Sequence, residues 1–143
     1  MRASPELNIP ARFWRVHYNG ACYPGKPGLH GLARGANCQH FAYELLRHFD
    51  REVPNLRSSE LWADTRHSKV ATRLRPLDLL LFNRTRRARG AHVAVYLGGG
   101  KAVHLCKAIG RPVIWNLKEF GELDSYRVFV GGKRFAVVRA QGT

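Results

Sequence analysis

Two apolar runs on either side of three consecutive glycines constrain the fold of this chain most strongly. The runs cover residues 92–97 and 102–106, and the turn between them is Gly98-Gly99-Gly100. Short apolar runs joined by a glycine-rich turn are typical of an antiparallel β-hairpin. Since alternate residues of a strand share a face, the hairpin also fixes which side chains can meet across it.

The two histidines of this hairpin, His92 and His104, meet only if the turn has the right length. A three-residue turn pairs Leu97 with Lys101 and sets His92 opposite Cys106. The histidines then become diagonal neighbours on one face, roughly 7–8 Å apart at the backbone, which imidazole rings can bridge. A two-residue turn shifts the parity and separates them. The pattern therefore predicts a histidine pair that depends on this turn.

A cysteine begins the clearest helical pattern in the chain. Cys38 follows Asn37, a favourable N-cap, and apolar residues then recur at three- and four-residue spacings. We predict a helix over 38–49 with one buried stripe. The unpaired N–H groups and the macrodipole at a helix N-terminus stabilise a thiolate, the reactive form of cysteine.

These three side chains form a candidate catalytic set. Cys38 is the candidate nucleophile, and His92 takes or shares its proton as a thiolate–imidazolium pair. His104 would bind the far nitrogen of His92 and fix its tautomer and orientation. The backbone N–H of Cys38 would help to hold an oxyanion. The set predicts acyl transfer through a thioester.

The remaining pattern predicts a single α+β domain over 1–143, whose residues 1–36 are a loop-rich arm. A short second helix is expected from Ser59 to Arg66. About six strands are expected in all, and Gly131-Gly132 is expected to form a tight turn between the last two. The expected strands are 79–82, 92–97, 102–106, 112–115, 126–130 and 135–138.

The chain is strongly basic, with 24 Lys+Arg against 10 Asp+Glu and a net charge of +14. Such a charge favours an anionic partner, which could be a cell-wall polymer, lipid headgroups, nucleic acid or an acidic protein. A plainly solvated basic surface explains the same composition. The Arg84–Arg89 cluster could likewise contact a polyanion or form a solvated loop, and we slightly prefer the solvated loop.

The cysteine count argues against both a disulfide framework and a zinc site. Cys22, Cys38 and Cys106 are odd in number and form no CxxC pair. No metal and no organic cofactor is expected. The N-terminal stretch lacks the apolar run of a signal peptide, and no segment is long enough to span a membrane. As encoded, the protein is expected in the cytoplasm, or exported by a route that needs no cleavable signal.

Four other residues have simpler expected roles. His40 lies two positions after Cys38 and cannot face it on a helix, so we place it on the helix surface or pocket wall. Cys106 is expected in the β core, although it shares the histidine face. Cys22 is expected in a loop, and Asp78 is expected to organise the turn into its strand.

The same residues resemble the NlpC-type cysteine peptidases, a papain-like superfamily of bacterial cell-wall hydrolases. The similarity runs over about residues 18–117. The family's Asp-Cys-Ser-Gly block resembles the stretch that begins at Asn37-Cys38, and its Gly-Asp-Leu strand entry resembles Leu77-Asp78-Leu79. Its His-Val-Gly-Ile-Tyr-Leu-Gly strand resembles residues 92–98, and its third polar residue falls at His104.

This resemblance implies a papain-like fold, in which the cysteine helix packs on an antiparallel sheet. It also implies a Cys38-His92-His104 triad that hydrolyses a peptidoglycan-type peptide or a small amide. Family members carry a tyrosine near the substrate before the cysteine, for which Tyr18 and Tyr23 are both candidates. Gln39, beside the cysteine, is a further candidate for substrate binding.

Two other functions stay open. Asn37-Cys38-Gln39-His40-Phe41 is closer in wording to the lecithin:retinol acyltransferase-like branch of the superfamily, whose motif reads Asn-Cys-Glu-His-Phe. That branch has its histidines before its cysteine, whereas the order here is Cys, His, His. An intracellular thiol acyltransferase or specialised amide hydrolase is therefore one alternative. A non-catalytic basic module that binds nucleic acid or anionic polymer through its surface is the other.

Overall fold

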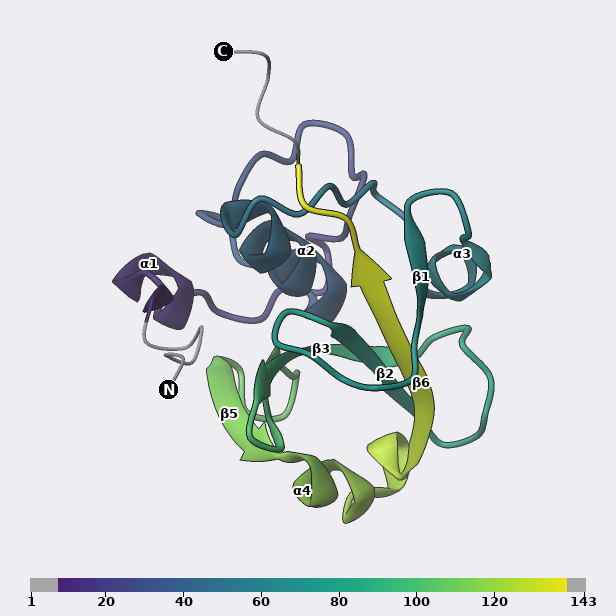
Figure 1. Cartoon of the computed structure of the whole chain (residues 1–143). Coiled ribbons are helices and arrows are strands. Elements are labelled where there is room, and N and C mark those ends of the chain that lie inside the picture. Colours follow the sequence, from purple (N-terminus) through teal and green to yellow (C-terminus); the bar gives the residue numbers. More distant parts are fainter. Residues whose placement is uncertain (1–7, 139–143) are drawn as a thin grey trace.

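The computed structural model describes residues 8–138 and contains one antiparallel sheet with short helices around it (Figure 1). The strands run in the order β1-β6-β2-β3-β4-β5. This arrangement confirms the predicted α+β fold with six strands. The strands are β1 (Ser68–Ala71), β2 (Leu79–Asn83), β3 (His92–Gly98), β4 (Lys101–Leu105), β5 (Pro112–Asn116) and β6 (Val128–Phe135). The helices are α1 (Ala11–Trp14), α2 (Cys38–His48), α3 (Ser58–Ala63), α4 (Leu117–Gly121) and the 3₁₀ helix η2 (Asp124–Tyr126).

Helix α2 begins at the cysteine, as the sequence predicts. The side-chain oxygen of Asn37 accepts a hydrogen bond of 2.8 Å from the backbone N–H of His40, which caps the helix. The apolar stripe, made of Phe41, Ala42, Leu45 and Leu46, is fully buried. The helix lies against β3 and β4, so the cap and the stripe together fix where Cys38 sits.

The sheet buries both of its faces, against different partners. The α2 face consists of aliphatic side chains that lie in one core cluster with the helix: Leu79, Leu81, Val93, Val95, Val103 and Leu105. The opposite face, which we call the α4 face, contains Leu80, Phe82, Ala94 and Ala102 packed with Phe120 of α4. Figure 1 shows α2 and α4 on opposite sides of the sheet.

The hairpin has the predicted register, although its turn differs from the predicted one. Val95 pairs with Val103 and Tyr96 pairs with Ala102, as a three-residue turn would give. However, the strands end at Gly98 and Lys101, and the register shifts by one residue between Tyr96 and Gly98. The turn is therefore two residues long, and a β-bulge restores the parity that this shorter turn would have reversed.

The C-terminal half of the sheet differs from the prediction. Strand β6 runs unbroken through Gly131-Gly132, so the expected turn and the separate strand 135–138 are wrong. A β-bulge lies there instead: Leu81 of β2 pairs with Gly131, whereas the next residue, Phe82, pairs with Phe129. Gly131 has a φ of 151°, and a Cβ at this position would collide with the indole of Trp62. The glycines therefore admit a neighbouring side chain rather than a reversal.

Three smaller differences concern short elements. Strand β1 was not predicted, the second helix begins and ends earlier than predicted, and the arm contains the one-turn helix α1. Among residues 8–138, no helix combines the length and apolar character needed to cross a bilayer.

Candidate functional site

The two hairpin histidines form a hydrogen-bonded pair on the α4 face. His92 begins β3 and His104 lies in β4, and the bulged hairpin brings their rings together. The Nε2 atom of His92 lies 2.8 Å from Nδ1 of His104. Both side chains are buried. Since Nε2 of His92 is occupied by this contact, Nδ1 is the nitrogen that remains for a nucleophile.

Aromatic rings enclose the pair. Tyr126 of η2 stacks on His92 with ring centroids 4.2 Å apart and an interplanar angle of 15°. Trp115 and Phe120 contact the ring of His104 at centroid distances of 4.2 Å and 4.6 Å. The sequence analysis assigned Tyr126 only to a strand, and no local pattern could have shown that it lies against His92. The enclosure restricts both imidazoles to one orientation.

The hydrogen bond within the pair couples the two tautomers. For His92 Nδ1 to accept a proton, Nε2 must carry its own hydrogen and donate it to Nδ1 of His104. His104 must then carry its hydrogen on Nε2, a buried atom without a hydrogen-bond partner in the described part of the chain. The orienting role expected for His104 is compatible with this geometry.

The Cys38 thiol lies where α2 meets β3. Backbone N–H groups of Cys38, Gln39 and Val93 interact with the sulfur and each lowers the pKa of the thiol. Val93 directly follows His92 in the chain, so this contact joins the cysteine to the start of the histidine strand. Burial outweighs these N–H groups, and the net effect is to raise the pKa of Cys38.

The pKa directions of the cysteine and the two histidines bear on the expected thiolate–imidazolium pair. Burial lowers the pKa of His92, and the neighbouring His104 lowers it further. Burial also lowers the pKa of His104. A raised thiol pKa and lowered imidazole pKa values both favour neutral groups. These directions favour a neutral thiol and neutral imidazoles at the candidate site.

Two further residues reach the thiol region. Cys106 is buried, and it is among the groups that raise the pKa of the Tyr126 phenol, after burial. Burial raises the pKa of Tyr18, and electrostatic interactions with Cys38 and Cys106 raise it further. Of the predicted substrate residues, Tyr18 thus has an electrostatic interaction with the cysteine.

The other two predicted substrate residues have different surroundings. Tyr23 contacts the guanidinium of Arg57, whose carbon lies 4.8 Å from its ring centroid. The side-chain amide of Gln39 is buried and donates hydrogen bonds to the hydroxyl of Tyr43, at 3.0 Å, and to the carbonyl of Leu56, at 3.1 Å. The Gln39 amide therefore supports the helix start and has both contacts inside the protein.

His40 is not on the surface, which corrects the first of its two expected places. Its side chain is 5% exposed, and its Nε2 lies 2.8 Å from the carbonyl oxygen of Gly31. The ring thus fastens the loop before α2. The prediction for Asp78 is confirmed, since its carboxylate accepts a hydrogen bond from the backbone N–H of Arg75 in the turn and a bidentate pair from Arg134.

A pocket of about 620 Å³ opens beside the cysteine. Its walls come from the start of α2, the start of α3 and the connection before β3. The residues that line it are Asn37, Cys38, Gln39, Arg57, Ser58, Ser59, Arg89, Gly90 and Ala91. Because Cys38 is among these residues, we take this pocket as the candidate active site.

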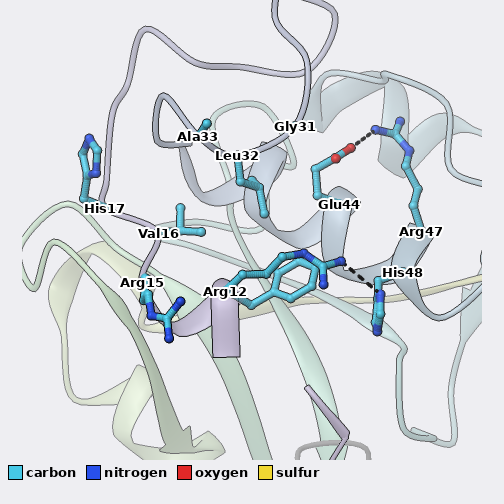
Figure 2. Close-up of a pocket in the computed structure, with 11 residues that line it drawn as sticks. Arg12, Arg15, Val16, His17, Gly31, Leu32, Ala33, Glu44, Arg47 and His48 are labelled. Carbon is cyan, nitrogen blue, oxygen red and sulfur yellow. Dashed lines mark hydrogen bonds and ion pairs between the residues drawn. The ribbon is translucent and has the colours of Figure 1, made fainter. Parts of the chain in front are cut away.

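A larger pocket, of about 740 Å³, lies at the opposite end of α2 (Figure 2). Arg12 and His48 approach each other there at 3.3 Å, and Arg47 forms a 2.8 Å ion pair with Glu44. It contains no cysteine, whereas Cys38 lines the smaller pocket, and neither pocket is lined by His92 or His104. Volume alone therefore does not identify the site. Within the described residues, no three His, Cys, Asp or Glu side chains are grouped so that they could hold a metal ion.

The fold itself resembles that of a known protein. An NlpC/P60 family protein from Bacillus cereus ATCC 10987 has a similar structure, with a TM-score of 0.55 and 22% sequence identity. The match covers 71% of this chain and 32% of the other, so this chain spans about a third of that protein's length. No protein-family model and no curated protein matches the sequence. The chain thus has an NlpC/P60-like, papain-like α+β fold.

Proposed function

We propose that this protein is a cysteine-dependent amide hydrolase that acts through Cys38, His92 and His104. The observation that carries the proposal is the 2.8 Å histidine pair, whose His92 directly precedes the residue, Val93, that interacts with the sulfur of the helix-terminal Cys38. Nucleophilic acyl transfer needs a nucleophile, a base that takes its proton and a third group that orients the base. Cys38, His92 and His104 would fill these three roles.

The steps follow from the neutral resting state. His92 Nδ1 accepts the thiol proton as Cys38 attacks the amide carbonyl, and His104 stabilises the imidazolium that forms. The backbone N–H groups of Cys38 and Gln39 interact with the sulfur. They would also donate hydrogen bonds to the oxyanion of the tetrahedral intermediate. His92 then returns the proton to the leaving amine, and a thioester remains. Water, deprotonated by His92, hydrolyses the thioester and regenerates the thiol.

For the substrate we propose peptidoglycan-type peptides. The choice rests on the resemblance to NlpC-type peptidases and on the NlpC/P60-like fold. The direct experiment is digestion of purified muropeptides, with products identified by mass spectrometry. Wild type should cleave a peptide bond and Cys38→Ala should not, whereas Cys22→Ala, at a cysteine outside the pocket, should retain cleavage. Undiminished cleavage by Cys38→Ala would overturn the proposal.

The acyltransferase alternative rests on the Asn-Cys-Gln-His-Phe wording. In this fold Gln39 and His40 bind Leu56 and Gly31, so the wording has a structural explanation that requires no acyltransferase chemistry. Adding an amine acceptor to the digestion and measuring the ratio of transfer to hydrolysis separates the two reactions. The non-catalytic alternative rests on the charge of +14. Salt-sensitive polymer binding by a protein without turnover would favour it.

A further inference from the structure

A third pocket, of about 560 Å³, opens where β1 and β2 begin and where β6 ends. We call it the basic pocket, because its lining includes five arginine and lysine side chains and one carboxylate. These charged residues are Arg51, Arg66, Lys69, Arg75, Arg134 and Asp78. The basic pocket shares no lining residue with the pocket beside Cys38.

The carboxylates at the basic pocket are already saturated by the protein. Asp78 accepts hydrogen bonds from Nε and Nη2 of Arg134, at 2.8 Å and 2.7 Å, and from the backbone N–H of Arg75 at 2.8 Å. Asp64, next to the lining, accepts a 2.7 Å hydrogen bond from the hydroxyl of Ser68. These carboxylates therefore hold the surrounding loops together and leave the other cations of the pocket without a negative partner.

Three cations of the basic pocket have no anion beside them. The side chains of Arg66, Lys69 and Arg75 are exposed, and within residues 8–138 they take part in no ion pair. Strand pairing also sets Lys69 of β1 directly opposite Arg134 of β6. Like charges in directly opposite positions of two strands repel each other. An anion bound here would relieve that repulsion.

The arrangement of these cations suits a chain of phosphate groups. They lie on the separate segments 66–69 and 75, so they can contact more than one negative group of a ligand. The planar fork of an arginine matches the oxygens of a phosphate. Single-stranded nucleic acid would also need a ring on which a base can stack. The one Phe, Tyr or Trp of the lining is Phe135, which is only 3% exposed.

We propose that the basic pocket is a second binding site, which holds a chain of phosphate groups that carries no bases. Inorganic polyphosphate and polyol-phosphate polymers share this chemistry. The site goes beyond the proposed hydrolysis and does not depend on it. Leu79 at the start of β2 pairs with Val95, whereas Phe82 near its end pairs with His92. The basic pocket thus lies at the end of β2 away from the histidine pair, and both sites can be occupied together.

The first test measures binding by calorimetry at physiological salt, with inorganic tripolyphosphate and with a glycerol phosphate oligomer of the same phosphate number. Wild type should bind at least one of the two, and the tighter ligand identifies the source of the phosphate chain. Arg66→Gln/Lys69→Gln/Arg75→Gln should weaken that binding about tenfold or more, because three charge contacts are lost together. Binding of neither compound by wild type would overturn the proposal.

A matched control separates the basic pocket from the net charge of the protein. Arg86→Gln/Arg87→Gln/Lys118→Gln removes as many positive charges, at exposed residues that do not line the basic pocket. It should leave the affinity within about twofold of wild type, because exposed charges beyond roughly 8 Å are screened at this salt concentration. Equal losses in the two triple variants would contradict a site at this pocket.

The second test locates the ligand on the wild-type protein and therefore does not depend on how the variants fold. Tripolyphosphate and the oligomer are titrated while the amide NMR signals of Ser68 and Leu77, in the basic pocket, are compared with that of Gly90 beside Cys38. Shifts at Ser68 and Leu77 without a shift at Gly90 support the site, and the reverse pattern overturns it.

The same titration with oligothymidylate of equal phosphate number tests the absence of base recognition. We expect it to bind no more tightly than the better of the two base-free compounds. Tighter binding of oligothymidylate would overturn the proposed ligand class in favour of nucleic acid. Failure of the phosphate site would leave the hydrolase proposal standing, because cleavage of muropeptides by wild type and its loss in Cys38→Ala are measured without these ligands.

Discussion

The two faces of the sheet differ in chemistry although they belong to the same strands. In β2, β3 and β4 the α2 face is aliphatic, and it packs against the helix that carries the proposed nucleophile. The α4 face has the smaller core cluster and includes the histidine pair under aromatic rings. Successive residues of β3 and β4 face opposite sides of the sheet. Each strand therefore contributes one set of residues to the aliphatic core and the other set to the face with the proposed catalytic histidines. Stability and chemistry should therefore respond to different substitutions.

The largest expected effect is on turnover, from a change on the α4 face. His92→Ala removes the proposed general base and should lower kcat/KM by about 10²- to 10⁴-fold, the usual contribution of such a group. The melting temperature should change far less than activity, because no large apolar side chain is lost. Muropeptide kinetics and thermal unfolding measure the two. If the His92→Ala variant were unfolded at the assay temperature, His92 would be needed for stability, which contradicts this prediction.

The reciprocal change lies on the α2 face. Leu81 is fully buried against the helix side of the sheet. Leu81→Ala should lower the free energy of unfolding by about 2–5 kcal/mol, through lost apolar contacts and the cavity left behind. The folded fraction should keep a normal kcat. Denaturant titration and active-site-normalised kinetics test this, and a normal stability with a collapsed kcat would reverse the assignment of the faces.

A smaller effect on turnover is expected at the second histidine. His104→Ala should reduce kcat by roughly one to two powers of ten, less than loss of the base itself, because His104 orients the ring rather than reacts. His104→Asn offers an oxygen to Nε2 of His92 and should recover part of the loss. Full activity in His104→Ala would show that the pair is not used in catalysis.

The pH dependence of stability gives the mildest test. Unfolded histidines have a pKa of about 6.5, while the folded pKa values of His92 and His104 are lowered. The unfolded chain therefore binds more protons below pH 6.5, and stability falls as the pH falls through that range, by up to about 1.4 kcal/mol per pH unit for each histidine. Denaturant titrations from pH 7 to 5 should show this slope, and His104→Asn should reduce it. An unchanged slope would mean that the buried ring is not its source.

The parts of the fold that follow local rules were predictable from sequence. The cap at Asn37 and the apolar spacing located α2 to within one residue at its end. The apolar runs and glycines located β3 and β4, and the register of their pairing was correct. The turn length was wrong, because a bulge is set by the fit between strands and leaves no mark in the glycine pattern.

What local patterns could not reveal depends on contacts between distant segments. Gly131-Gly132 reads as a turn until Trp62 is placed against it. The contact of Tyr126 with His92 becomes apparent only when η2 is placed against β3. The raised pKa of Cys38 is likewise a result of burial, which the favourable helix start alone did not suggest.

The most direct test of the account is to capture the covalent intermediate. The protein is mixed with a muropeptide that it cleaves, quenched in acid, and mapped by mass spectrometry for a thioester. The account predicts an acyl group on Cys38 in wild type and none there in His92→Ala under the same conditions. An acyl group on Cys22 or Cys106, or continued cleavage by Cys38→Ala, would contradict the claim that Cys38 and the histidine face form one active site.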